Sequence, residues 1–110
     1  MGENDNIPQM TPSFENICRK DENGNEYWSS RDLCGAMGYS AYWKFQRVID
    51  KAIKVAGEKG MNVDEHFNQA ADMVKIGNGS FRKVNIFRLS RMACMIIAEN
   101  ADSKKVLVQQ

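Results

Sequence analysis

The side chains with the clearest chemical potential in this sequence are basic, and many of them fall in one short stretch. The segment from Met73 to Ala93 contains no acidic residue, although the whole chain has a net charge of only +1. Its basic residues are Lys75, Arg82, Lys83, Arg88 and Arg91. Because surfaces that carry both signs of charge resist aggregation better, an acid-free basic run either arises by chance or serves an anionic partner.

A second group of cations recurs at helical spacing. These residues are Lys44, Arg47, Lys51 and Lys54. Steps of three and four residues predict a basic stripe along one face of a helix. Such a stripe fits either an ordinary solvated surface or a phosphate-binding site. Trp43 stands beside the stripe, where it would either stack on an unpaired base or pack into the core.

The distribution of charge along the chain supports a polyanionic partner. Residues 1–40 have a net charge of −4, whereas residues 41–110 have a net charge of +5. This asymmetry indicates a molecule with two differently charged faces, of which the basic one is available to a polyanion.

Catalytic and metal-binding chemistry is poorly supported. Asp64, Glu65 and His66 are consecutive, so on a helix their side chains point about 100° apart and do not converge on one ion. The only histidine has no HxxxH or HExxH partner, and Gly77-Asn78-Gly79 lacks the spacing of a phosphate-binding loop. No base can be assigned to a serine or cysteine nucleophile. We therefore expect a domain that is not an enzyme and has no metal or cofactor.

Length and composition indicate one small intracellular domain. The chain has 110 residues, 43% hydrophobic and 26% charged, without a long apolar run or a signal peptide. Its three cysteines form no CxxC pair, which predicts reduced thiols and a cytoplasmic location. We expect a flexible leader over 1–12, a folded domain over 13–105 and a truncated tail over 106–110. Asp102 and Ser103 are typical of the start of a further helix, but the chain stops eight residues after Asp102, too soon for such a helix to bury anything. The chain is therefore expected to be part of a longer protein.

The first half of the domain predicts one hairpin and two helices. Residues 14–18 and 26–28 lie on either side of a turn at Asn23-Gly24 and predict the two strands of a hairpin. Ser29 is expected to cap a short helix, and Ser40 a longer helix over 41–56. The apolar residues of the longer helix are Tyr42, Phe45, Ile49, Ala52 and Ala56.

The second half predicts a helix, a basic hairpin and a final helix. Residues 62–72 are expected to be helical, and residues 73–89 to form a hairpin around Gly77-Asn78-Gly79. Ser90 is expected to cap a helix over 92–98. The complete pattern predicts a small α+β domain with two β-hairpins and about four α-helices.

The alternation along the second hairpin predicts where its basic side chains point. Arg82 and Arg88 share their phase with Val84 and Ile86, whereas Lys83 lies in the opposite phase. We expect Val74, Ile76, Val84 and Ile86 to share the buried face. The basic residues of this hairpin would then be divided between its two faces.

An ordered series of motifs resembles a known family. In order along the chain, the series is FENICRKDENGNEYWSSRDLCGAMGYSAYWKFQRVIDKA, NVDEHF, MVKIGNGS and LSRMACMIIAEN. Together they resemble the N-terminal domain of the DNA-damage-inducible protein D family, which belongs to the BRO-N superfamily. The resemblance runs from about Phe14 to Lys105.

The resemblance implies an α+β domain with a role in DNA binding and, in bacteria, an association with the SOS response. Residues that match the family's basic or polar pattern are Arg31, Lys75, Arg82 and Arg91. The chain departs from the family at Met92 and Met95, where relatives usually have tyrosine. Aromatic stacking at these two positions is therefore not expected here.

Two functions remain open from the sequence. The leading hypothesis is binding of single- or double-stranded DNA through phosphate contacts from ten residues: Arg31, the four cations of the stripe, and Lys75, Arg82, Lys83, Arg88 and Arg91 in and beside the basic hairpin. The alternative is a protein-interaction module that docks onto a repair or recombination factor through Met92, Met95 and Ile96. Neither hypothesis requires a membrane, and the sequence fits several oligomeric states.

Overall fold

The fold is α+β, as the sequence predicts. The computed structural model describes residues 9–10, 12–101 and 108–109, with side chains described for 12–101. The helices of this part are α1 (Pro12–Asn16), α2 (Ser30–Ala36), α3 (Tyr42–Glu58), α4 (Val63–His66) and α5 (Arg91–Asn100). The strands are β1 (Gln9–Met10), β2 (Arg19–Lys20), β3 (Glu26–Ser29), β4 (Phe67–Lys75), β5 (Phe81–Leu89) and β6 (Val108–Gln109).

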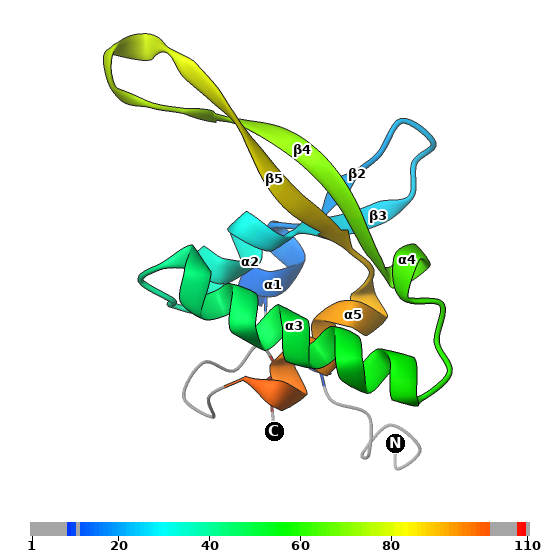
Figure 1. Cartoon of the computed structure of the whole chain (residues 1–110). Helices are drawn as coiled ribbons and strands as arrows, with labels where there is room; N and C mark the ends of the chain where they lie inside the picture. Colours follow the sequence, from blue (N-terminus) through cyan, green and yellow to red (C-terminus); the bar gives the residue numbers. More distant parts are fainter. Residues whose placement is uncertain (1–8, 11, 102–107, 110) are drawn as a thin grey trace.

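A four-stranded antiparallel sheet has the strand order β2-β3-β5-β4. Strands β4 and β5 pair along nine positions, from Phe67 opposite Leu89 to Lys75 opposite Phe81. Strand β3 pairs with β5 only at the Leu89 end, through Trp28 and Ser29. Residues 67–89, with the 3-10 turn η2 (Gly77–Gly79), therefore form a long two-stranded arm whose far part extends beyond β3, drawn in green to gold in Figure 1.

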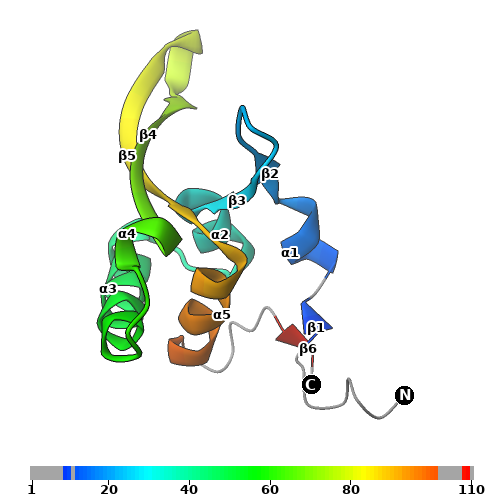
Figure 2. The same cartoon turned by 90° about the vertical axis from the view of Figure 1, so that its right-hand side faces the viewer.

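The core lies where the helices pack against the base of the sheet. Phe14 of α1 stacks on Trp28 with ring centres 4.4 Å apart, and the indole Nε1 donates a 2.9 Å hydrogen bond to the Phe14 carbonyl. Other fully buried side chains are Leu33, Phe45, Ile49, Leu89 and Ile97. Figure 2 shows α3 and the arm on the side of the molecule opposite α1. This arrangement leaves α3 and the arm as neighbouring surfaces.

The predicted helix over 62–72 is wrong beyond its first turn. Asn62 caps α4 by accepting a hydrogen bond from the Glu65 amide, but the chain becomes strand β4 at Phe67. Val63, Phe67, Ala70 and Ala71 have helical spacing, which misled the sequence prediction. Nine pairs with β5 satisfy the backbone instead, because cross-strand pairing outweighs a weak helical pattern.

Two further local predictions require correction. The predicted strand over 14–18 is mostly helical, since α1 occupies Pro12–Asn16 and the strand is limited to Arg19–Lys20. Ala41, not Ser40, is the N-cap of α3, and it makes no side-chain capping bond. The caps at Ser29 and Ser90 are confirmed, because each hydroxyl accepts a backbone N–H bond from the following helix.

The predicted leader and tail lie largely outside the described residues. In the described parts of the leader and tail, β1 pairs antiparallel with β6, so Gln9 is opposite Gln109 and Met10 opposite Val108. The helix start suggested by Asp102 is also outside the described residues. In the described part, no helix is both long enough and apolar enough to cross a membrane. All three cysteines are described and are free thiols.

Candidate nucleic-acid interface

The predicted basic stripe lies on the outer surface of α3. Lys44, Arg47, Lys51 and Lys54 are all exposed. The opposite face of the same helix is buried through Phe45, Ile49, Ala52 and Ala56. The helix thus presents four cations along one side while its other side anchors it to the core.

Trp43 belongs to this outer surface and not to the core. Its side chain is 59% exposed, which excludes the core-packing alternative. Lys44 Nζ and Arg47 Cζ lie 5.6 and 5.3 Å from its ring centre, within the range of cation–π contacts. The first turns of α3 therefore combine an exposed aromatic ring with two cations.

The arm carries exposed cations on both faces. Lys75, Arg82 and Lys83 are exposed near its tip. In the observed register Met73 is opposite Lys83 and Lys75 is opposite Phe81, so Lys75 and Lys83 share one face. Arg82 is opposite Val74 and lies on the other face. The predicted division of the basic residues between two faces is confirmed.

The predicted apolar face of the arm is only partly correct. Val84 and Ile86 are buried and Val74 is half-buried, as predicted. Ile76 follows the end of β4 and is 42% exposed. The arm is therefore packed near its base and uncovered near its tip.

A groove of about 500 Å³ separates the arm from the first half of α3. Its polar lining comes from Tyr42, Gln46, Gln69, Lys83 and Asn85. Amide side chains offer both donors and acceptors, so this lining suits a polar ligand. Lys83 is the predicted arm cation that the structure brings to α3.

Ser30 holds the groove together, a role that the sequence did not reveal. This buried hydroxyl accepts a 2.9 Å hydrogen bond from the Phe87 amide and is hydrogen-bonded to the Tyr42 hydroxyl at 2.8 Å. It thereby joins α2, β5 and α3. Burial raises the pKa of Tyr42, so the phenol stays protonated in this junction at neutral pH.

Two of the predicted arginines lie against aromatic rings. Arg31 is exposed, with its Cζ 4.1 Å from the ring centre of Tyr42, close to the groove. Arg88 is half-buried over the ring of Tyr27 at 4.7 Å. Its Nε is buried without a hydrogen-bond partner among the described residues. Arg31 remains accessible to a ligand, whereas Arg88 is largely covered.

The surroundings of Arg88 are acidic. Arg88 lines a hollow of about 280 Å³ that is also lined by the carboxylates of Asp21, Glu26, Asp64 and Glu65. These negative charges would repel a phosphate group. Of the predicted arm cations, Arg88 is therefore less suited to bind phosphate than those near the tip.

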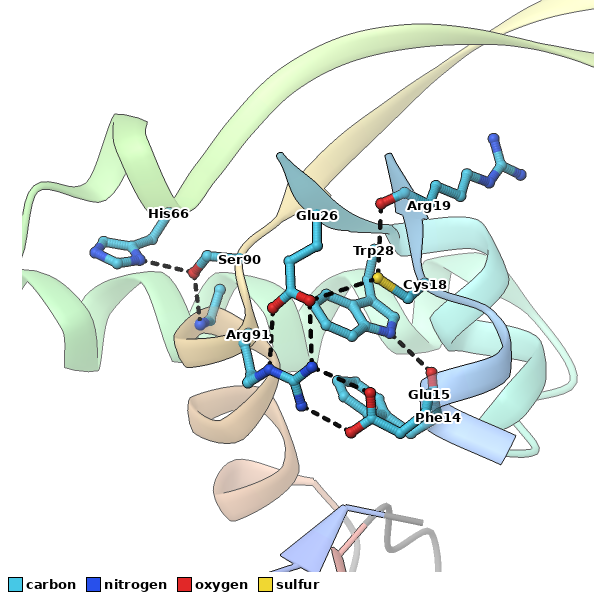
Figure 3. Close-up of polar contacts among 10 residues, drawn as sticks. Phe14, Glu15, Cys18, Arg19, Glu26, Trp28, His66, Ser90 and Arg91 are labelled. Carbon is cyan, nitrogen blue, oxygen red and sulfur yellow. Dashed lines mark hydrogen bonds and ion pairs between the residues drawn. The ribbon is translucent and has the colours of Figure 1, made fainter. Parts of the chain in front are cut away.

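Arg91 forms its contacts with residues of the domain itself (Figure 3). Its guanidinium forms ion pairs with Glu15 at 2.7 Å and Glu26 at 3.0 Å, and Cζ lies 5.0 Å from a ring centre of Trp28. Hydrogen bonds to the two carboxylates raise the pKa of Arg91, and the bond from Arg91 lowers that of Glu15. The contacts tie α1 and β3 to the start of α5, which gives Arg91 a structural role.

A histidine–serine contact is the other feature that the sequence did not reveal. His66 Nδ1 lies 2.7 Å from Ser90 Oγ, which also accepts a 3.0 Å hydrogen bond from the Ala93 amide (Figure 3). The contact links the end of α4 to the cap of α5. Among the described residues, no group of three His, Cys, Asp or Glu side chains has an arrangement that could hold a metal ion.

Comparison with known proteins gives one informative match. The chain is 38% identical over 95 residues to DNA damage-inducible protein D of Escherichia coli. The match covers 86% of this chain and 35% of that protein, so the chain spans about a third of its relative's length. No family model and no solved structure matches the chain. The predicted resemblance to DNA-damage-inducible protein D is thus confirmed over most of this chain.

Proposed function

We propose that this chain is a DNA-binding domain that brings a DNA-damage-response protein of the bacterial cytoplasm to DNA. Its contacts are mainly to phosphates. The name of the E. coli relative supports the connection with DNA damage, and the SOS response is the setting that we propose for it. The proposed activity is binding without catalysis, and it requires no cofactor.

The observation that carries this proposal is the availability of the predicted cations. Of the ten residues, Arg91 alone forms an ion pair with a described carboxylate. Seven others are exposed on α3 and near the tip of the arm. They are Lys44, Arg47, Lys51, Lys54, Lys75, Arg82 and Lys83. Phosphate contacts supply most of the affinity in sequence-independent DNA binding, so unpaired exposed cations are the residues it needs.

A protein partner is the second candidate, and one residue favours it. Met92 is 54% exposed on α5, and methionine adapts well to varied surfaces. Ile96, which the sequence assigned to the same surface, is only 2% exposed and belongs to the core. The apolar surface on α5 is therefore smaller than the sequence predicted.

Salt dependence of binding distinguishes the two candidates. Labelled DNA is titrated with the chain at several salt concentrations, and fluorescence anisotropy gives the dissociation constant. About five phosphate contacts predict a slope near −4.5 when the logarithm of affinity is plotted against that of salt concentration. A flat profile, or no binding at low salt, would contradict DNA binding and favour the protein partner. Charge reversal of Arg82 and Lys83 together should weaken binding to all DNA sequences alike.

A further inference from the structure

The outer arm, residues 73–83, projects from the rest of the domain, and at its base Lys83 lines the groove beside α3. Three strand pairs and the turn make up this segment, and Figure 1 shows it projecting from the helices. All of its residues are exposed except Val74, which is half-buried. A two-stranded hairpin with nothing packed on either face adds little to the stability of a fold. A ligand that contacts both faces of the outer arm would explain its projecting shape better than a role in stabilising the fold.

The charges of the outer arm match a ligand with phosphates on two sides. Lys75 and Lys83 lie on one face and Arg82 on the other, without an acidic residue between Met73 and Ala93. A hairpin that lay flat on a strand of nucleic acid would need cations on one face only. A ribbon that enters a duplex groove with its turn first has one phosphate backbone beside each of its two faces.

The dimensions of the outer arm also fit a groove. Three residue pairs at roughly 3.4 Å per residue give a length of about 10 Å before the turn. The major groove of B-DNA is about 12 Å wide and 8.5 Å deep, and it admits a two-stranded ribbon. Phe81 belongs to the strand pair nearest the turn and is 60% exposed, so its ring would reach the groove floor, where apolar side chains contact thymine methyl groups.

We propose that the outer arm enters the major groove of duplex DNA as a two-stranded ribbon. Lys75 and Lys83 face one phosphate backbone and Arg82 faces the other. The inference rests on the proposed DNA-binding function and adds the form of the DNA and the way in which the arm contacts it. It also gives a reason for the division of the basic residues between two faces.

The test neutralises one cation on each face. Arg82→Gln and Lys83→Gln are compared with Lys59→Gln, a control at the exposed end of α3 away from the groove. Anisotropy titrations use a labelled duplex and one of its single strands over a range of salt. We expect tighter binding to the duplex, and a salt slope smaller by about 1 in each arm variant but unchanged in the control. Arg82→Lys and Lys83→Arg should restore the slope.

The other outcomes overturn the inference in distinguishable ways. A change of slope in only one arm variant would mean that the arm lies flat on the DNA. Tighter binding to the single strand would exclude a groove of duplex DNA as the preferred ligand. Binding with neither slope changed would remove the arm from the interface while the proposed function stands. Absence of binding to both probes at low salt would overturn the inference and the proposed function together.

Discussion

Arg91 donates two parallel hydrogen bonds to Glu15, a residue 76 positions earlier in the chain. The Nη1–Oε2 and Nη2–Oε1 distances are 2.7 and 3.0 Å. The pair connects α1 to the first turn of α5 beside the stacked rings of Phe14 and Trp28. A residue that the sequence assigned to DNA therefore has a contact set sufficient to explain it within the fold.

Replacing Arg91 with lysine should destabilise the domain. Lysine keeps the charge but cannot make two parallel bonds to Glu15 while also bonding Glu26. We expect the free energy of unfolding to fall by about 1 kcal/mol, since the pairs are partly exposed but form a network. Thermal unfolding would show a melting temperature lower by about 4 °C or more.

The matched control for this substitution is Arg82→Lys. Arg82 is exposed and has no carboxylate partner among the described residues, so its replacement should change stability by less than about 0.5 kcal/mol. Equal stability of the Arg91→Lys variant and the parent chain would exclude a structural role for the Arg91 network.

The Glu15 contact should also make stability depend on acidity. Its bond from Arg91 lowers the pKa of Glu15 below the ordinary value of 4.5. A carboxyl whose pKa is lower in the folded state than in the unfolded state stabilises the folded state when the pH is above the unfolded-state pKa. This contribution is lost as the pH falls through the folded-state pKa. The parent chain should therefore be more stable than Glu15→Gln at pH 7, with a difference that shrinks below about pH 4.5.

Urea unfolding of both proteins between pH 7 and pH 3 measures this difference. The Arg91→Lys background provides the control, because Glu15 should matter less once its bidentate partner is gone. A difference between the parent chain and Glu15→Gln that stays constant over the whole pH range would show that ionisation of Glu15 does not contribute.

Local signals in the sequence predicted much of the fold. Ser29 and Ser90 were identified as caps because their side chains satisfy the first amides of a helix, which needs no distant contact. The turn at Gly77–Gly79 was predicted because Asn78 and Gly79 both tolerate positive φ, observed here as 58° and 81°. The buried apolar face of α3 was predicted correctly because its apolar residues recur at intervals of three and four positions.

Distant contacts account for what the sequence did not predict. Residues 67–72 of strand β4 were mistaken for a helix because the pairing partner that determines their structure begins at Phe81, beyond the turn. Nothing near Arg91 in the sequence indicates that two glutamates would approach it from α1 and β3. The positive charge of the candidate site was visible in the distribution of basic residues along the chain. Only the structure shows which of these cations are exposed and which form contacts within the domain.

Loss of the Ser90 hydroxyl should weaken the start of α5. The hydroxyl accepts the Ala93 amide and contacts His66 Nδ1, so Ser90→Ala should lower the free energy of unfolding by about 1 kcal/mol. Ser40→Ala is the control, because Ser40 was predicted as a cap but Ala41 occupies that position. Chemical unfolding should show a lower free energy of unfolding for Ser90→Ala only. A similar decrease in both variants would mean that the Ser90 cap contributes no more to stability than the exposed Ser40 hydroxyl.

Substitution of Gly79 should disturb the tip of the arm while leaving the core intact. Gly79 has a φ of +81°, and an added Cβ would meet no atom within 4 Å, so the cost of Gly79→Ala is backbone strain of about 1 kcal/mol. The Ile76 amide donates a 2.8 Å hydrogen bond to the Ser80 carbonyl across this turn. Its hydrogen exchange should become about fivefold faster. Gly77→Ala, also in open space but without a positive φ, should leave the exchange nearly unchanged. Equal exchange in the two variants would show that the left-handed conformation at Gly79 does not hold the tip closed.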